Sequence, residues 1–262
     1  MVEQTIRFDD GADYEQMMGI WSRSAGEIFL DWLAPLPGLR WIDVGCGNGA
    51  FTQLLVERCA PAEVQGIDPS EGQLTFARTR STSDMAEFRQ GDAMALPFPA
   101  GRFDAAVMAL VIIFVPDPAK GIAEMARVVR PGGTVATYMW DMTGGGFPVD
   151  PVLVELRAMG FAPSRPPRME ASRMKALQDL WTGAGLEALE TREIAVQRTF
   201  ADFDDFWTTQ LNFPSVGPVV ATMAPADVET LKSRVRAALP ADADGRITYG
   251  ARAHAIKGYL PK

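Results

Sequence analysis

The sequence has little of what builds metal centres and disulfide frameworks. It contains two cysteines, Cys46 and Cys59, and one histidine, His254, among 262 residues. Two cysteines are too few for a disulfide framework or for a zinc site. We therefore expect no metal, and free thiols suit a reducing compartment such as the cytoplasm.

The chain also lacks a basic surplus and a long hydrophobic run. Its 25 Lys and Arg residues face 33 Asp and Glu residues, which gives a net charge of −8. Nucleic acids bind basic surfaces, so we expect no nucleic-acid partner. The longest apolar run, around 105–115, is shorter than the ~18 residues of a membrane span, and the first ten residues lack the apolar segment of a secretory signal. A small molecule is the expected partner; the oligomeric state is not indicated.

What the chain does have is a strand that runs into a glycine-rich loop and then a helix. Residues 41–44 are largely apolar, Gly45, Gly47 and Gly49 follow at alternate positions, and a helical pattern begins near residue 50. Glycine lets the backbone turn tightly and lets a ligand approach without a Cβ in the way. This order is typical of one half of a nucleotide-binding βαβ unit.

Strand and helix patterns alternate along the rest of the chain. We expect strands at 40–44, 64–67, 87–90, 103–110, 134–140, 186–199 and 245–259, and helices at 13–34, 50–59, 70–80, 117–130, 151–160, 169–184 and 202–239. This pattern predicts an α/β protein with a doubly wound, mostly parallel seven-stranded sheet. We expect one domain over residues 1–262, in which 1–38 form an N-terminal helical cap and 39–142 a cofactor-binding core. Residues 143–262 then supply the late strands, with a helical insertion at 202–240 before the last of them.

Four of the expected strands have polar or glycine-rich residues or a candidate backbone contact at their C-terminal ends, at 43–49, 68, 92 and 109–110. Ligands of such sheets bind at the carboxyl ends of the strands, so these positions should converge on one crevice. Gly45-x-Gly47-x-x-Ala50 also fits a loose dinucleotide fingerprint, which leaves a nicotinamide-dependent oxidoreductase open. Asp43, two residues before the first glycine, counts against that alternative, as do the polar strand end at 91–93 and the Pro-Gly-Gly at 131–133.

Together these segments resemble the class I S-adenosylmethionine-dependent methyltransferases. The matching segments are Asp43–Gly49, Ile67–Ser70, Gly91–Ala93 with Leu96–Phe98, Phe103–Asp104, Asp117–Pro118 and Arg127–Gly133. The resemblance covers residues 40–140 and is strongest for the small-molecule branch that includes the ubiquinone and menaquinone biosynthesis enzymes. It implies a Rossmann-like methyltransferase fold and transfer of a methyl group from S-adenosyl-L-methionine to a small acceptor. The transfer would be an in-line displacement, catalysed mainly by positioning, with S-adenosyl-L-homocysteine as the product.

The resemblance also implies the residues that hold the cofactor. The glycines would pass under the methionyl part, Asp43 would fix the loop, and Asp68 would accept from both ribose hydroxyls. The full set of expected cofactor residues is Asp43, Gly45, Cys46, Gly47, Gly49, Asp68, Pro69, Gln73, Asp92, Ala93, Ala109, Leu110, Phe114, Tyr14 and Arg23.

No catalytic residue is predicted. In the family one or two histidines often follow the fourth strand, whereas Ile113 and Phe114 stand there in this chain. A protein that binds S-adenosylmethionine without catalysis therefore stays open. Trp140 and Asp141 end the fifth strand, where acceptors often lie, and are the candidate substrate residues. We expect His254 to be structural or on the surface.

Overall fold

The computed structural model of the chain describes residues 11–80, 85–239 and 241–262, with side chains in the first helix from Met18 onward. Seven strands form one sheet: β1 (Arg40–Val44), β2 (Glu63–Asp68), β3 (Ala86–Gln90), β4 (Phe103–Ala109), β5 (Val129–Trp140), β6 (Glu187–Phe200) and β7 (Ile247–Tyr259). Their order is β3-β2-β1-β4-β5-β7-β6, and only the pairs made by β7 are antiparallel. The expected doubly wound, mostly parallel seven-stranded sheet is confirmed.

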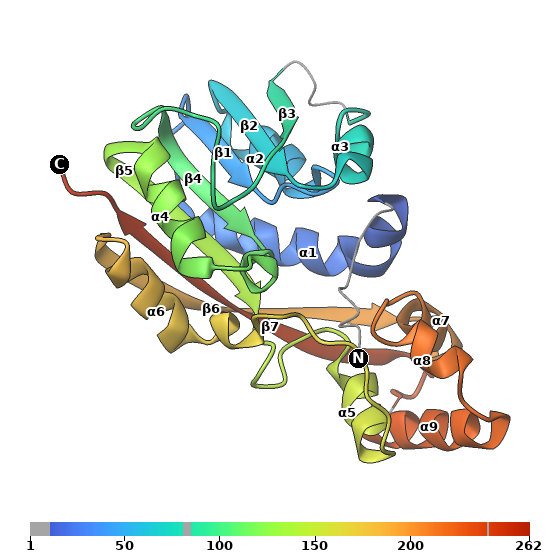
Figure 1. The fold of residues 1–262 in the computed structure, drawn as a ribbon. Helices are drawn as coiled ribbons and strands as arrows, with labels where there is room; N and C mark the ends of the chain where they lie inside the picture. The colour runs from blue at the N-terminus through green and yellow to red at the C-terminus, as the bar shows by residue number, and fades with distance from the viewer. Residues whose placement is uncertain (1–10, 81–84, 240) are drawn as a thin grey trace.

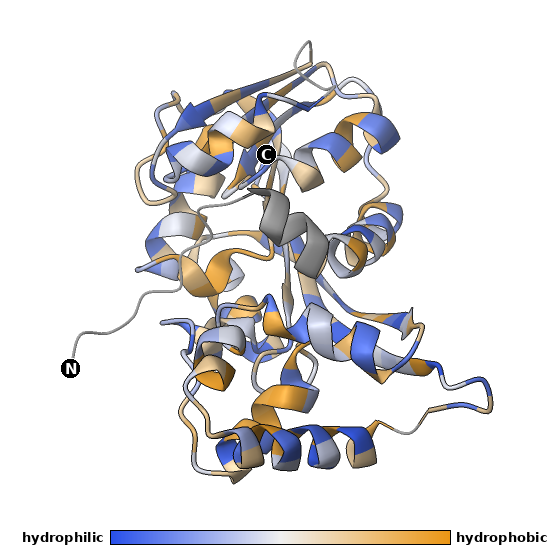
Figure 2. Ribbon diagram, turned by 90° about the vertical axis from the view of Figure 1, so that its right-hand side faces the viewer, coloured by the Kyte–Doolittle hydropathy of each residue, from blue (hydrophilic) through white to orange (hydrophobic). Residues whose placement is uncertain are grey.

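Helices cover both faces of this sheet (Figure 1). They are α1 (Gly11–Leu33), α2 (Ala50–Cys59), α3 (Glu71–Ala77), α4 (Pro118–Val128), α5 (Asp150–Ala158), α6 (Met174–Gly183), α7 (Phe203–Leu211), α8 (Gly217–Ala221) and α9 (Pro225–Ala238), with short 3₁₀ turns η1 (Ile112–Phe114) and η2 (Met169–Ser172). α1 packs on α2 and α3, and α4 packs on α6. Hydrophobic and hydrophilic residues alternate around the helices, as expected of helices that pack on one side (Figure 2).

The order in which strands are added to the sheet reverses at β1, and this reversal determines where the site lies. β2 and β3 lie on one side of β1, while β4 and β5 lie on the other. Ile42 pairs with Gln65 of β2 and with Ala106 of β4. The carboxyl ends of β1 and β4 therefore flank a topological switch point, which is where open α/β sheets bind their ligands.

Strand β5 begins earlier than expected. Phe103 pairs with Val129 and Ala105 with Thr134, so the residues between Val129 and Thr134 bulge out of the ladder. Gly132 adopts a φ of +73° there. The Pro-Gly-Gly segment was expected to precede the strand, but it forms an irregularity inside it.

Two expected helices are divided in the structure. The segment at 169–184 consists of η2 followed by α6, and the segment at 202–239 consists of α7, α8 and α9. Pro218 and Pro225 lie in the first turns of α8 and α9, because proline suits a helix start and breaks a helix interior. Helix α3 ends at Ala77, three residues before its expected end at residue 80.

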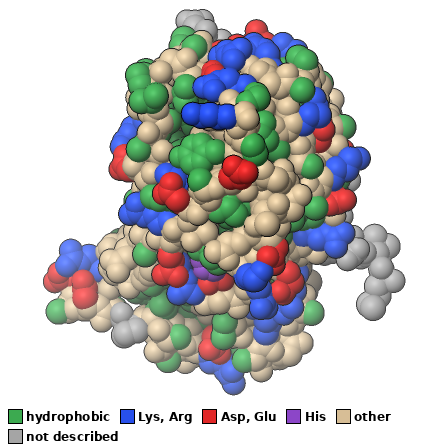
Figure 3. All heavy atoms as spheres, turned by 90° about the vertical axis from the view of Figure 1, so that its left-hand side faces the viewer, with side chains coloured by type: hydrophobic (Ala, Val, Ile, Leu, Met, Phe, Trp, Pro, Cys, Tyr) green, Lys and Arg blue, Asp and Glu red, His purple; other side chains and the backbone are tan. Residues whose placement is uncertain are grey.

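A group of helices connects the long antiparallel strands β6 and β7. α7, α8 and α9 lie between these two strands in the chain, and α9 packs on α5 (Figure 1). The expected helical insertion before the last strand is confirmed. Among the described helices none combines the length and apolarity of a membrane span. On the face seen in Figure 3, basic and acidic side chains are intermixed.

Candidate functional site

A cavity of about 1230 Å³ opens at the carboxyl ends of the parallel strands. Its cofactor end is formed by the loops after β1, β2 and β3, namely residues 43–50, 68–73 and 91–93. Its distal end is formed by the segments 113–116, 139–142, 147–157, 164–169 and 213–215. Lining residues from these segments include Phe114, Trp140, Asp150, Arg157, Arg165 and Phe213. Pockets for one small ligand usually measure roughly 300–1,000 Å³. The cavity therefore has room for two molecules at once.

The glycine loop presents its backbone to the cofactor end. Gly45, Gly47 and Gly49 have φ values of +76°, +52° and +77°, which L-residues rarely adopt. The amides of Gly45 and Cys46 both donate to the Ile67 carbonyl, at 2.7 and 3.1 Å, and tie the loop to β2. A Cβ at Gly47 would meet only Gln73 Oε1, at 3.9 Å, so open space lies above this backbone.

Asp43 places a buried carboxylate beneath this loop. Its Oδ2 accepts from the Thr52 hydroxyl at 2.6 Å, while its Oδ1 has no partner among the described residues. Burial raises the pKa of Asp43 to about 7; the Thr52 hydrogen bond opposes this shift, and the charge of Asp68 adds to it. Asp43 lines the cavity, so the unpaired oxygen is an acceptor available to a cationic or N–H group of a ligand.

The raised pKa of Asp43 predicts a pH dependence of the empty protein. Between about pH 4 and pH 7 the native state holds a proton on Asp43 that the unfolded state has released, so stability falls as pH rises. Asparagine does not titrate, so Asp43→Asn should not show this loss. The free energy of unfolding of the variant minus that of wild type should therefore increase by about 3 kcal/mol from pH 5 to pH 8. Urea unfolding at several pH values measures this difference. Asp117→Asn, at the helix cap of α4, is the control, and an Asp43→Asn difference that does not change with pH would contradict the assignment.

Asp68 is held at the end of β2 by two backbone amides. Its Oδ2 accepts from Gly47 N and its Oδ1 accepts from Ser70 N, both at 2.9 Å. Ser70 in turn caps α3 by accepting from Gln73 N at 3.4 Å, as the Ser-x-x-Gln spacing predicts. Each carboxylate oxygen has a second lone pair, so Asp68 can accept two further hydrogen bonds from a ligand. Burial raises the pKa of Asp68.

Asp92 closes the cofactor end from the loop after β3. Its Oδ1 accepts from Met94 N at 2.8 Å in a turn, and its side chain is exposed. Asp92 and Ala93 both line the cavity. Asp92 thus shapes the turn and keeps Oδ2 available.

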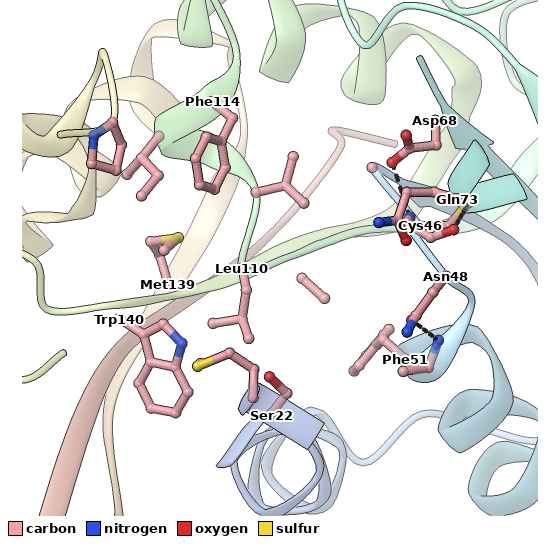
Figure 4. A pocket seen from close by; sticks show the side chains of 18 of the residues that line it. Ser22, Cys46, Asn48, Phe51, Asp68, Gln73, Leu110, Phe114, Met139 and Trp140 are labelled. Carbon is pink, nitrogen blue, oxygen red and sulfur yellow. Dashed lines mark hydrogen bonds between the residues drawn. The ribbon is translucent and has the colours of Figure 1, made fainter. Parts of the chain in front are cut away.

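Most of the expected cofactor residues meet at this cavity. Those that line it are Asp43, Gly45, Cys46, Gly47, Asp68, Pro69, Gln73, Asp92, Ala93, Ala109, Leu110, Phe114 and Arg23. In the close view, Asp68, Gln73, Cys46 and Asn48 gather at one side and Phe114, Met139 and Trp140 at the other, with Leu110 between them (Figure 4).

Two expected cofactor residues, Gly49 and Arg23, have contacts within the protein that bear on their role. A Cβ at Gly49 would lie 3.1 Å from Ala77 and 3.2 Å from Phe88, so Gly49 serves the packing of the loop on its neighbours. Arg23 forms ion pairs with Glu27 and Glu57 at the protein surface, which occupy its guanidinium. Tyr14 lies in the part of α1 whose side chains are outside the described residues.

The two candidate substrate residues separate in the structure. Trp140 lines the distal end, and its buried Nε1 has no acceptor within the described part of the chain. Asp141 lies outside the described lining and accepts from Arg252 at 2.6 Å and from Gly144 N at 2.8 Å. Its position therefore favours a structural role in holding the loop after β5, and a substrate contact by Asp141 stays a prediction. His254, whose Nδ1 lies 2.8 Å from the Ser172 carbonyl, belongs to the same structural group.

Several lining residues were missed from the sequence. Arg80 donates to the Asn48 carbonyl at 2.6 Å and fastens the segment after α3 to the glycine loop. Helix α1 adds Met18 and Ser22, and the distal end adds Asp150, Arg157 and Arg165, all from segments that carry no motif. Their helical spacing was visible in part, but no pattern showed that these segments fold over the same cavity.

Residues 42–137 match the family model described as methyltransferase domain. A demethylmenaquinone methyltransferase of Lactococcus lactis subsp. lactis is 34% identical over 132 residues, which are 47% of this chain and 52% of that protein. The chain spans about half or less of the length of the curated relatives it matches first.

Solved structures share the fold at low identity. The YcgJ protein of Bacillus subtilis aligns with a TM-score of 0.62 and 18% identity over 91% of this chain and 98% of that one. The phosphoethanolamine N-methyltransferase 2 of Haemonchus contortus, in complex with phosphomonomethylethanolamine and S-adenosylhomocysteine, aligns with a TM-score of 0.61 and 16% identity over 100% of this chain and 60% of that one. The Rossmann-like methyltransferase fold and the resemblance to class I methyltransferases are confirmed, and the nicotinamide-dependent alternative is not favoured.

Proposed function

We propose that this chain, whose residues 42–137 match a methyltransferase domain, is an S-adenosylmethionine-dependent methyltransferase of a small molecule. The observation that carries the proposal is the convergence of Asp43, Asp68 and the glycine loop at one end of a cavity with room for a second molecule. The similar proteins include a demethylmenaquinone methyltransferase and a fatty-acid O-methyltransferase, and methylation of small molecules by these proteins supports the proposal.

The residues at the cofactor end fit the chemical groups of S-adenosylmethionine. The unpaired Oδ1 of Asp43 suits an ammonium group, and the free lone pairs of Asp68 suit two ribose hydroxyls. Pro69 and Gln73 line the place next to Asp68 where an adenine would follow the ribose. Asp92, with Oδ2 unused by the turn, would accept from the adenine amino group.

When bound, the cofactor supplies a methyl group that is already activated on a sulfonium. The chain's own residues then have to align the acceptor and keep water out, and such positioning contributes roughly 7–11 kcal/mol to catalysis. Leu110 has a φ of +62° and turns the chain between the two ends of the cavity. Phe114 and Trp140 form apolar walls on the distal side, so the acceptor meets the cofactor beside apolar side chains that exclude water.

The distal end favours an acceptor with an apolar or aromatic body. Its lining includes Phe114, Met139, Trp140, Phe147 and Phe213. Aromatic and methionine side chains adapt to flat or irregular apolar ligands.

We propose that residues 1–262 form one methyltransferase domain. In this domain α1 is the cap, the strands to β5 form the cofactor core and the later segments form the acceptor lobe.

Turnover tests this proposal against a protein that only binds the cofactor. The chain is incubated with S-adenosylmethionine and a panel of phenols, hydroquinones and apolar carboxylic acids, and S-adenosylhomocysteine is quantified. The expected result is product that depends on at least one acceptor and that is lost in Asp68→Ala. Binding of S-adenosylmethionine without turnover across the panel would favour the non-catalytic alternative.

A further inference from the structure

Two arginines at the distal end carry positive charge into a lining that is otherwise apolar except for Asp150, Ser164 and Ser215. Arg157 lies in the last turn of α5, and Arg165 lies in the loop that follows; both line the cavity. Ser164 lines it beside them and offers a neutral hydroxyl donor. These residues belong to no motif that the proposed function uses.

Neither guanidinium has a partner among the residues that the structure describes. Within the described ranges, Arg157 and Arg165 make no side-chain hydrogen bond and no ion pair within 4.0 Å, whereas Arg23, Arg168 and Arg252 each have one. The Nε of Arg157 is fully buried and unsatisfied. Arg157 as a whole is half-buried and Arg165 is exposed, so the cost of burial falls on this one N–H. A buried N–H without an acceptor is costly, because its hydration is lost and nothing replaces it.

The neighbourhood has a net positive charge that one carboxylate would balance. Burial lowers the pKa of Arg157, and the nearby charge of Arg165 lowers it further. Asp150, two helical turns before Arg157, is the acidic group that acts on Arg157, but its Oδ2 already accepts from Phe147 N at 3.0 Å. Two arginines and one aspartate leave a single positive charge, which matches a monoanion better than a phosphate dianion.

We propose that the acceptor is an amphiphilic carboxylic acid whose carboxylate binds between Arg157 and Arg165 while its apolar body lies along the wall of Phe114 and Trp140. Arginine suits this role because its planar fork binds both oxygens of a carboxylate. The inference rests on the proposed function, since it names the class of molecule that occupies the distal end. The carboxylate would anchor the acceptor at the far end of the cavity and so fix which of its atoms reaches the cofactor.

The test uses three probes that share a phenyl body: 3-phenylpropanoate, 3-phenylpropan-1-ol and 2-phenylethyl phosphate. Quenching of tryptophan fluorescence measures binding, because Trp140 lines the cavity. We expect wild type to bind the carboxylate at least tenfold more tightly than the alcohol and more tightly than the phosphate. In Arg157→Gln the advantage over the alcohol should fall below about threefold, and Arg157→Lys, which keeps the charge without the fork, should be intermediate.

Arg173→Gln is the matched control. Arg173 is an exposed arginine that pairs with Glu170 close to the same loop, and its variant should keep the full carboxylate preference. Equal binding of carboxylate and alcohol, no binding of the carboxylate, tighter binding of the phosphate, or an unchanged preference in Arg157→Gln would each overturn the proposal. S-Adenosylhomocysteine binding is measured on the same proteins. If wild type does not bind S-adenosylhomocysteine, the proposed function is wrong. If wild type binds S-adenosylhomocysteine but shows no carboxylate preference, only this inference is wrong.

Discussion

Replacing Asp68 with alanine is expected to weaken S-adenosylhomocysteine binding by roughly 10²–10⁴-fold. The variant loses two hydrogen bonds from the ribose to a charged acceptor, each worth about 1.5–3 kcal/mol, and each 1.4 kcal/mol is about tenfold in affinity. It also releases the amides of Gly47 and Ser70, which Asp68 now holds at 2.9 Å. Isothermal titration calorimetry of wild type and variant measures the change.

Asp117→Ala separates this effect from a general loss of a helix cap. Asp117 also accepts a backbone amide at a helix start, from Lys120 N at 3.1 Å, but it lies at α4 outside the described lining of this cavity. The control variant should bind S-adenosylhomocysteine as wild type does. If Asp68→Ala bound within threefold of wild type, the ribose assignment would be wrong.

Replacing Gly45 with alanine is expected to destabilise the protein by about 2–5 kcal/mol. A Cβ at this position would lie 2.5 Å from Val111 Cγ1 and 2.7 Å from Cγ2. Overpacking of this kind costs about 1–3 kcal/mol, and a left-handed conformation costs an L-residue roughly 1–2 kcal/mol more. Valine has a stiff χ1 and cannot turn aside freely. Urea unfolding gives the free energy, and cofactor binding should weaken as well because the loop shifts.

Gly160→Ala is the matched control for backbone strain alone. Gly160 has a φ of +87°, and a Cβ there would meet no heavy atom within 4 Å. It should cost only the roughly 1–2 kcal/mol of the left-handed conformation. The double variant Gly45→Ala, Val111→Ala removes the two closest contacts and leaves only Cβ of residue 111, at 3.0 Å. It should therefore be less destabilised than the sum of its single variants. A Gly45→Ala variant no less stable than Gly160→Ala would refute the close approach of Val111.

The cofactor end could be foreseen because its residues are tied to strand ends. Asp43 and Asp68 lie at the carboxyl ends of strands that hydrophobicity marks clearly, and Asp92 follows the more polar strand β3. Parallel strands bring their carboxyl ends to one edge. The left-handed glycines and the Ser70 cap also depend on local backbone chemistry that a sequence displays. These features depend on residues close together in the sequence, so they can be predicted without knowing how distant segments pack.

The distal end could not be foreseen, because long-range packing builds it. Asp141 directly follows β5, just as Asp43 lies at the carboxyl end of β1. Asp141 nevertheless forms a structural ion pair with Arg252 of β7, 111 positions later. The sequence alone does not show that β5 and β7 are neighbours with Trp140 opposite Ala253. Arg157 and Arg165 likewise meet the cavity only because α5 and its following loop fold over the sheet edge.

Binding of S-adenosylmethionine at the cofactor end is best tested by a calorimetric titration of the wild-type chain with this compound. The expected result is saturable binding of one molecule per chain, displaced by S-adenosylhomocysteine and unaffected by NADH. Absence of binding, or tight binding of NADH in its place, would contradict the proposed function.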